Sequence, residues 1–136
     1  MPDKPITDIA QLSFLVVEDE AFSLAAITKT LAGMGAKEIA TAADGIKALA
    51  HLDQQTPPDV MLLDLNMPEM GGVGVLRHLA ERDYTGAIIL VSGADKDTIA
   101  VAESLANYRE LNVLGNIVKP MTAASLGTLL APLLNP

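Results

Sequence analysis

The chain has 136 residues, half of them hydrophobic, and a formal net charge of −8 at pH 7. This length suits one domain with a buried core, and the apolar content argues against a disordered chain. The negative charge argues against a direct nucleic-acid surface, because phosphate backbones attract basic patches. The sequence contains no cysteine, so disulfides and thiolate metal sites are excluded.

We expect residues 1–13 to be an N-terminal leader and residues 14–136 to form a single domain. The leader lacks the basic start and the apolar centre of a signal peptide, and no later apolar run is long enough to span a bilayer. The sequence therefore predicts a cytoplasmic protein that does not insert into a membrane.

In the first part of the chain, two apolar runs alternate with two helical patterns. Residues 14–17 and 38–42 predict strands, the second weaker than the first. Residues 21–34 predict a helix, because apolar residues recur along one helical face. Asp44 has the side chain of a helix cap, so a second helix is expected to follow it. The apolar residues of this second helix are Ile46, Leu49 and Leu52.

The middle of the chain contains two apolar runs that predict strands buried on both faces. They cover residues 60–63 and 87–91, and a polar residue follows each of them. Between them, residues 72–82 carry apolar side chains at helical spacing, so this segment predicts a third helix. Met67 and Met70 are expected to pack under the turn before this helix, because Met fills irregular gaps.

The last part of the chain predicts one strand between two helices. Asp95 can cap a helix that runs to about residue 108, and residues 113–118 predict the strand. Thr122 can cap the closing helix. Five strands alternating with five helices predict a flavodoxin-like, doubly wound α/β fold with a parallel sheet of strand order 2-1-3-4-5.

Most of the predicted strands end in residues with polar side chains. Each of these residues, taken alone, is more often a turn, cap or surface residue than part of a site. In an open α/β sheet, however, the carboxyl ends of the parallel strands meet at one edge. The residues that the fold would bring together there are Glu18, Asp19, Asp64, Ser92 and Lys119.

Three carboxylates, a hydroxyl and an ammonium describe a site for a divalent cation and a phosphoryl group. Clustered carboxylates repel one another, and Mg²⁺, a hard cation that prefers oxygen ligands, relieves that repulsion. A carboxylate can attack phosphorus and form an aspartyl phosphate when the charge on the transferring oxygens is neutralised. Mg²⁺ and Lys119 would neutralise this charge, and the Ser92 hydroxyl would donate a hydrogen bond to a phosphoryl oxygen.

The motifs VVEDE, DLNMPEMGG, VSG and VKP, in this order, resemble those of the receiver domains of bacterial two-component response regulators. The resemblance to these CheY-like domains runs from about residue 14 to residue 134. It implies a switch that takes a phosphoryl group from a phosphohistidine and then changes its interaction with an output domain or partner. The donor would be a sensor histidine kinase or a histidine phosphotransfer protein. The chain would not be an enzyme, since it would catalyse only its own phosphorylation and dephosphorylation.

The resemblance also implies a role for each residue of the site. Asp64 would be the phosphoacceptor, and Ser92 and Lys119 would contact the phosphoryl oxygens. The bond between Lys119 and Pro120 would be cis, an isomer that is rare elsewhere. The ligands of Mg²⁺ would be Asp19, Asp64, the main-chain carbonyl of Asn66 and, through a water molecule, Glu18.

Two positions depart from the usual pattern of this family. Asn116 stands where many receivers have an aromatic residue that turns inward on activation, which puts readout through that position in doubt. Gly93 follows Ser92 where many members have alanine, which predicts a more open site and a shorter phosphoryl lifetime.

The resemblance extends to partners. The segment LNVLGNIVKP resembles receivers attached to cyclic-di-GMP phosphodiesterase domains, so an output domain of this kind is one expectation. A phosphorylation-dependent homodimer is another. Phe22 lies beside the acid cluster in the predicted fold, where it either faces a docking kinase or phosphotransfer protein or packs into the core.

Two other classes of function stay open from the sequence. A receiver-like interaction module would keep the fold without being phosphorylated in the cell. A true enzyme on this topology would be a Mg²⁺-dependent phosphatase or a flavin carrier. The phosphatase would need a second acid where Asn66 stands, and the flavin carrier would need a phosphate-binding Gly/Ser/Thr loop where acids follow the first strand.

Overall fold

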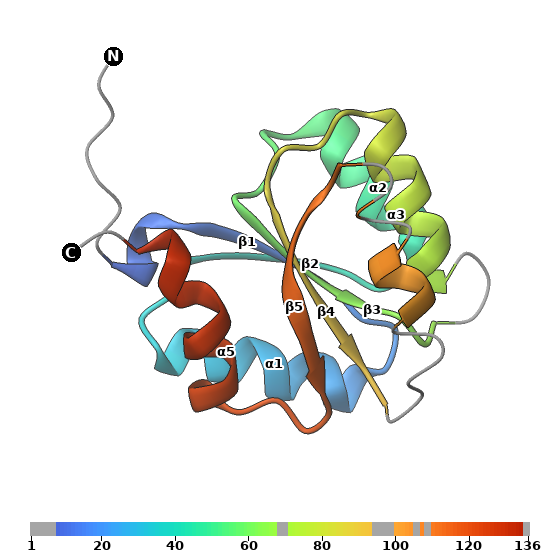
Figure 1. Cartoon of the computed structure of the whole chain (residues 1–136). Coiled ribbons are helices and arrows are strands. Elements are labelled where there is room, and N and C mark those ends of the chain that lie inside the picture. The colour runs from blue at the N-terminus through green and yellow to red at the C-terminus, as the bar shows by residue number, and fades with distance from the viewer. Residues whose placement is uncertain (1–7, 68–70, 94–99, 105–106, 108–109, 135–136) are drawn as a thin grey trace, which may run out of the picture.

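A computed structural model of the chain describes residues 8–67, 71–93, 100–104, 107 and 110–134. Its strands form one parallel sheet in the order β2-β1-β3-β4-β5, which confirms the predicted strand order (Figure 1). All four strand pairings are parallel. In chain order, the strands are β1 (Ser13–Val17), β2 (Glu38–Ala42), β3 (Val60–Asp64), β4 (Ala87–Ser92) and β5 (Asn112–Val118).

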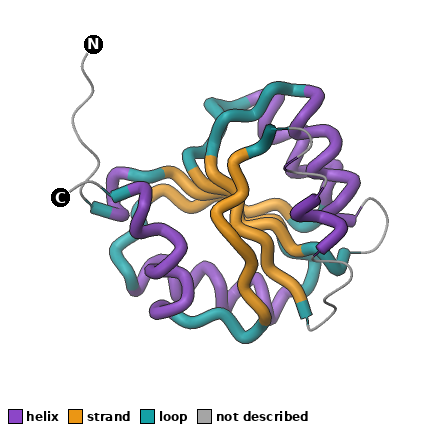
Figure 2. Tube along the Cα trace, viewed as in Figure 1, coloured by secondary structure: helices purple, strands orange, loops and turns teal. Residues whose placement is uncertain are grey.

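Helices cover both faces of this sheet, as Figure 2 shows. On one face lie α1 (Ala21–Gly33) and α5 (Ala123–Leu130). On the other lie α2 (Gly45–Gln54), α3 (Gly71–Glu81) and the helical residues 100–104, drawn in orange in Figure 1. The predicted cap of this last helix, Asp95, lies outside the described residues. Two short 3₁₀ helices, Ile9–Gln11 and Ala131–Leu133, lie close to the ends of the described chain.

The core consists of two apolar layers, one on each side of the sheet. Along β1, Leu15 belongs to the layer beneath α2 and α3, whereas Phe14 and Val16 belong to the layer beneath α1 and α5. Every residue of β3 and β4 is buried, which confirms that these apolar runs are strands covered on both faces. Because the sheet is parallel throughout, the chain leaves all its strands at the same edge.

The helices begin at the predicted caps where the structure describes them. The Asp44 carboxylate accepts a hydrogen bond from the N–H of Lys47 at 2.7 Å, and the Thr122 hydroxyl accepts one from the N–H of Ser125 at 3.0 Å. The cap of α1 was not predicted. It is Glu20, whose carboxylate accepts hydrogen bonds from the first turn of that helix. Glu20 is therefore engaged as a cap, although it stands next to the acids of the site.

Two details of the fold correct the sequence pattern. Ile46 is 61% exposed, whereas Ala48 is buried. The inner face of α2 follows the helical spacing of Gly45, Ala48, Leu49 and Leu52, and Ile46 lies outside that stripe. Strand β5 contains a β-bulge opposite Ile88 and Ile89. The bulge keeps both Leu114 and Ile117 in the layer beneath α5, an arrangement that regular alternation along a strand would not allow.

The bulge also sets the register that brings β5 to the site. Beyond it, Val118 pairs with Ser92, so that Lys119 is the first residue after the paired strand. The N–H of Lys119 then donates a hydrogen bond to the carbonyl of Ser92 at 2.8 Å. Among the described residues, no helix combines the length and the apolarity that crossing a bilayer requires.

Candidate functional site

The predicted site residues lie at the carboxyl edge of the sheet, where Asp64 and Ser92 end their strands and Glu18, Asp19 and Lys119 follow theirs. Backbone hydrogen bonds continue past the strand ends and hold these residues in place. The N–H of Glu18 donates to the carbonyl of Ala42 at 3.0 Å, and the N–H of Leu65 donates to the carbonyl of Val91 at 2.9 Å. The site is therefore anchored to the hydrogen-bonded sheet.

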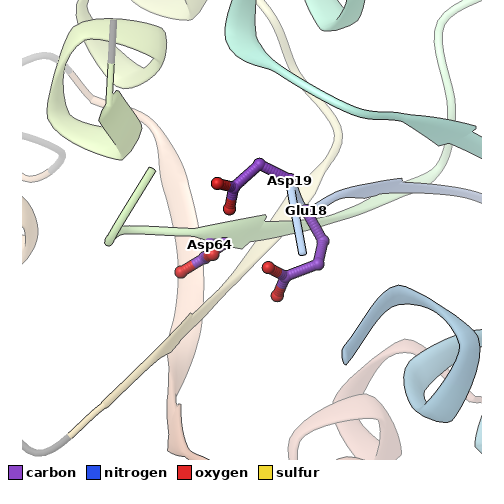
Figure 3. A group of neighbouring side chains, drawn as sticks. All are labelled: Glu18, Asp19 and Asp64. Atoms are coloured by element: carbon purple, nitrogen blue, oxygen red, sulfur yellow. The ribbon is translucent and has the colours of Figure 1, made fainter. Parts of the chain in front are cut away.

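The carboxylates of Glu18, Asp19 and Asp64 converge at this edge (Figure 3). One oxygen atom from each lies within 4.8 Å of the others. Glu18 and Asp64 are 1% and 2% exposed, whereas Asp19 faces solvent. Two of the three acids are thus removed from water, so their charges need compensation from within the protein or from a bound cation.

Lys119 supplies part of this compensation. Its Nζ lies 2.9 Å from Oε1 of Glu18 and 3.6 Å from Oδ2 of Asp64. The shorter contact is an ion pair without hydrogen-bond geometry, and no group among the described residues donates a hydrogen bond to this buried oxygen. The other oxygen of Glu18, Oε2, accepts a hydrogen bond from the N–H of Glu20 at 3.1 Å.

The protonation of this cluster reflects its burial. The pKa of Glu18 is raised to about 7, first by burial and then by the hydrogen bond with the neighbouring Asp64 carboxyl, while Lys119 opposes the shift. Partial burial works against the charged form of Lys119, but Glu18 and the charge of Asp64 outweigh it, so that the pKa of Lys119 is raised. Lys119 is therefore a cation at neutral pH.

The remaining predicted residues lie beside the acids, Asn66 on the loop after β3 and Ser92 at the end of β4. The N–H of Asn66 donates a hydrogen bond to Oδ1 of Asp64 at 2.9 Å, and its side-chain oxygen accepts one from the N–H of Gly93 at 3.1 Å. Ser92 is fully buried, and its hydroxyl donates to the carbonyl of Gly93 at 2.9 Å. In this structure the Ser92 hydroxyl thus points to the carbonyl of the next residue and not to the acids.

These residues fit a divalent cation. Glu18, Asp19 and Asp64 offer converging oxygen ligands, and the buried Oε1 of Glu18 has its hydrogen-bonding capacity unfilled within the described part of the chain. Hard cations such as Mg²⁺ prefer such an all-oxygen set. Asn66, whose main-chain carbonyl was predicted as a further ligand, lies two residues after Asp64 and is tied to it.

Residues 14–131 match the family described as the response regulator receiver domain. The chain belongs to this family. It is 33% identical over 119 residues to the cyclic di-GMP phosphodiesterase RocR of Pseudomonas aeruginosa, an alignment that covers 88% of this chain and 30% of RocR. It is 28% identical over 109 residues to the chemotaxis protein CheY of Bacillus subtilis, which covers 80% of this chain and 86% of CheY.

Solved structures of other response regulators share the fold of this chain. A response regulator from Colwellia psychrerythraea superimposes with a TM-score of 0.75 at 28% sequence identity, covering 90% of this chain and 95% of that protein. The chain spans about 30% of the length of RocR and of several other curated relatives. The predicted family, fold and two-component role are therefore confirmed for this domain.

Sequence reasoning overlooked the part that Gly72 plays in this receiver site. A Cβ atom on Gly72 would lie 2.6 Å from Cα of Leu65 and 2.8 Å from the carbonyl oxygen of Asp64. The start of α3 thus packs directly against the backbone that carries Asp64, and only glycine permits this approach. A glycine inside a helical pattern was the signal that could have identified it.

A small apolar pocket adjoins the receiver site between α1 and the loop after β5. Phe22 is 80% exposed at its rim, which excludes the alternative that it packs into the core. The Lys119–Pro120 bond is cis, as predicted, and both residues line this pocket. The pocket has a volume of about 160 Å³, and its remaining lining residues are Ser23, Ala26, Ile27 and Met121.

Met67 is buried under its turn as expected, while Met70 lies outside the described residues.

Proposed function

We propose that Asp64 of this receiver domain accepts a phosphoryl group from the phosphohistidine of a sensor histidine kinase or a histidine phosphotransfer protein. A carboxylate oxygen of Asp64 attacks phosphorus, and the phosphorus–nitrogen bond to histidine breaks. The electron pair of that bond returns to the imidazole nitrogen. The observation that carries the proposal is the convergence of Glu18, Asp19, Asp64 and Lys119 at the carboxyl edge of the sheet.

Asp64 suits this role better than its two acidic neighbours. Asp19 faces solvent, where it would not be shielded from water. Glu18 lies closer to the ammonium of Lys119 than Asp64 does, at 2.9 Å against 3.6 Å, and its raised pKa lowers the fraction of Glu18 that is an ionised nucleophile at neutral pH. Asp64 is buried and is oriented by the hydrogen bond from the N–H of Asn66.

The surrounding side chains serve the transferred group. Lys119 already lies 3.6 Å from Asp64, so its ammonium can pair with the oxygens of a phosphoryl group bound there. Ser92 can rotate its hydroxyl from the Gly93 carbonyl toward the same oxygens. When bound, Mg²⁺ supplies further charge neutralisation, held by Asp19, Asp64 and the main-chain carbonyl of Asn66, with Glu18 acting through a water molecule.

The phosphodonor protein would dock beside the site. The apolar pocket next to Lys119 and the exposed ring of Phe22 offer a surface for an apolar helix face of the donor. In this proposal the chain works in the cytoplasm and catalyses only its own phosphorylation and dephosphorylation. The likeness to RocR favours a cyclic-di-GMP phosphodiesterase as output domain or partner. A phosphorylation-dependent homodimer stays a prediction.

The experiment is to incubate the protein with Mg²⁺ and acetyl phosphate and to follow its intact mass. We expect a gain of one phosphoryl group that is lost on treatment with hydroxylamine and absent from Asp64→Asn. Asp83→Asn is the matched control, because Asp83 is exposed at a positive φ of 53° that asparagine also adopts. No gain with acetyl phosphate or with any kinase would favour an interaction module that is not phosphorylated.

A further inference from the structure

Asn66 connects two loops of the site through two different groups. Its main-chain N–H donates to Oδ1 of Asp64 at 2.9 Å, and its side-chain oxygen accepts the N–H of Gly93 at 3.1 Å. The loop after β3 is thereby tied to the end of β4 by a side chain that is itself exposed.

We propose that Asn66 is a latch for the unphosphorylated state, an inference that rests on the proposed phosphorylation of Asp64. In the resting protein its amide oxygen holds the N–H of Gly93. A phosphoryl group on Asp64 takes over this N–H, so the latch opens when the domain is phosphorylated. Asn66 is then a positioning residue whose side chain opposes the phosphorylated state, while its main chain stays part of the site.

The register of the sheet places Gly93 where this exchange can occur. Asp64 pairs with Val91, and the N–H of Leu65 donates to the carbonyl of Val91 at 2.9 Å. Gly93 follows two residues after Val91, at the same edge as the Asp64 carboxylate. A Cβ atom on Gly93 would meet no described atom within 4 Å, so the backbone here has room to turn.

A second donor, the hydroxyl of Ser92 at the end of β4, also has a partner within the protein. The Ser92 hydroxyl donates to the carbonyl of Gly93 at 2.9 Å, so the O–H of Ser92 and the N–H of Gly93 both have partners within the protein. A phosphoryl group on Asp64 would present up to three acceptor oxygens and about −1.5 to −2 of charge. Hydrogen bonds to charged acceptors are roughly twice as strong as neutral ones, so the phosphoryl group outcompetes the amide of Asn66.

The latch should change the affinity of the domain for a phosphoryl mimic. A neutral hydrogen bond contributes about 0.5–1.5 kcal/mol net, so removing the Asn66 side chain is expected to strengthen binding of a phosphoryl mimic roughly 2- to 12-fold. The opposite sign follows if the Asn66 amide instead donates to the phosphoryl oxygens, because alanine would then remove a favourable contact. The direction of the change therefore separates a latch from a ligand.

The test uses beryllofluoride with Mg²⁺ as the phosphoryl mimic. In isotope-labelled wild-type protein, the scalar coupling across the hydrogen bond from Gly93 N to the side-chain carbonyl of Asn66 should be present at rest and lost in the complex. Asn66→Ala should bind beryllofluoride roughly 2- to 12-fold more tightly than wild type. Asn112→Ala, which removes an exposed asparagine at the far end of β5, is the matched control.

Each outcome decides the proposal. A coupling that persists in the beryllofluoride complex overturns the latch, as does an Asn66→Ala affinity that is unchanged or weaker. Because the coupling is measured in the wild-type protein, this arm does not depend on the folding of a variant. If wild type takes up neither beryllofluoride nor a phosphoryl group from acetyl phosphate, the proposed function itself fails and the latch falls with it.

Discussion

The ammonium of Lys119 lies 2.9 Å from Oε1 of Glu18, although the two residues follow strands at opposite ends of the chain. Glu18 is 1% exposed, so this contact places a positive charge beside a buried carboxylate. Lys119 also reaches Asp64 at 3.6 Å, and it therefore stands between an acid that it neutralises and the proposed phosphoacceptor. Both metal binding and phosphorylation have to redistribute this charge.

Replacement of Lys119 by methionine should separate metal binding from phosphorylation. The ammonium repels a cation at the acid cluster, so Lys119→Met is expected to bind Mg²⁺ several-fold more tightly, measured by calorimetry. The same variant loses the cation that pairs with the transferred oxygens. Its rate of phosphorylation by acetyl phosphate should fall on the order of 100-fold.

Lys29→Met is the control for this pair of measurements, because Lys29 is an exposed lysine on α1. It should change neither quantity. Weaker Mg²⁺ binding by Lys119→Met would show that the lysine organises the acids. It would contradict the claim that its ammonium repels the metal ion.

The pH dependence of stability should report the burial of Glu18. Its pKa in the folded protein, about 7, lies above the value of 4.5 for an unshifted glutamate, so the folded state binds this proton more tightly. The corresponding stabilisation is complete below pH 4.5 and is lost as the pH rises through 7. In the absence of Mg²⁺, the free energy of unfolding of wild type relative to Glu18→Gln should fall by on the order of 2 kcal/mol across this window.

Urea unfolding of both proteins at pH 5 and pH 8 with a metal chelator gives this difference. A difference that stays constant between the two pH values would show that Glu18 titrates normally. Saturating Mg²⁺ should reduce the pH effect in wild type, because the cation favours the charged carboxylate.

Gly72 should be intolerant of any side chain. A Cβ atom would lie 2.6 Å from Cα of Leu65, so Gly72→Ala must displace the backbone that carries Asp64. We expect a loss of about 1–3 kcal/mol in unfolding free energy together with slower phosphorylation. Gly33→Ala is the control, because a Cβ there meets no described atom within 4 Å and the residue is helical. It should be neutral or stabilising by up to about 1 kcal/mol. Equal stabilities for the two variants, measured by urea unfolding, would contradict the proposed close approach.

Tyr84 should contribute to the stability of the domain but not to its phosphorylation. Its hydroxyl donates to the carbonyl of Pro58 at 2.8 Å, at the edge of the sheet opposite the site, and the residue is 7% exposed. Tyr84→Phe leaves that carbonyl without this donor and should lower the free energy of unfolding by about 1–2 kcal/mol. Phosphorylation by acetyl phosphate should proceed at the wild-type rate. A slower rate would mean that the two edges of the sheet are coupled.

The alternation of strands and helices could be predicted from local pattern. The runs at β3 and β4 are buried on both faces, and such continuous apolar segments hardly fit another architecture when helical patterns separate them. Once the sheet is parallel, topology alone brings Asp64, Ser92 and Lys119 to one edge. The residues at the carboxyl ends of the predicted strands were therefore enough to predict the candidate site.

What could not be predicted depends on contacts between segments far apart in the chain. The hydrogen bond between Asn66 and Gly93 requires two loops to meet, and no local pattern encodes that distance. The exposure of Phe22 was equally open, because an aromatic residue in the first turn of a helix can face either way. The sequence placed Gly72 only at the start of a predicted helix, since its packing partner, Leu65, is known only from the fold.

Reductive trapping tests the central claim most directly. Treating the phosphorylated protein with borohydride converts an aspartyl phosphate into homoserine, and peptide mass mapping then identifies the modified position. We expect homoserine at position 64 in wild type, dependent on Mg²⁺. Modification at Glu18 or Asp19 instead, or no modified acid in protein that carries the phosphoryl mass, would contradict the assignment of Asp64 as the phosphoacceptor.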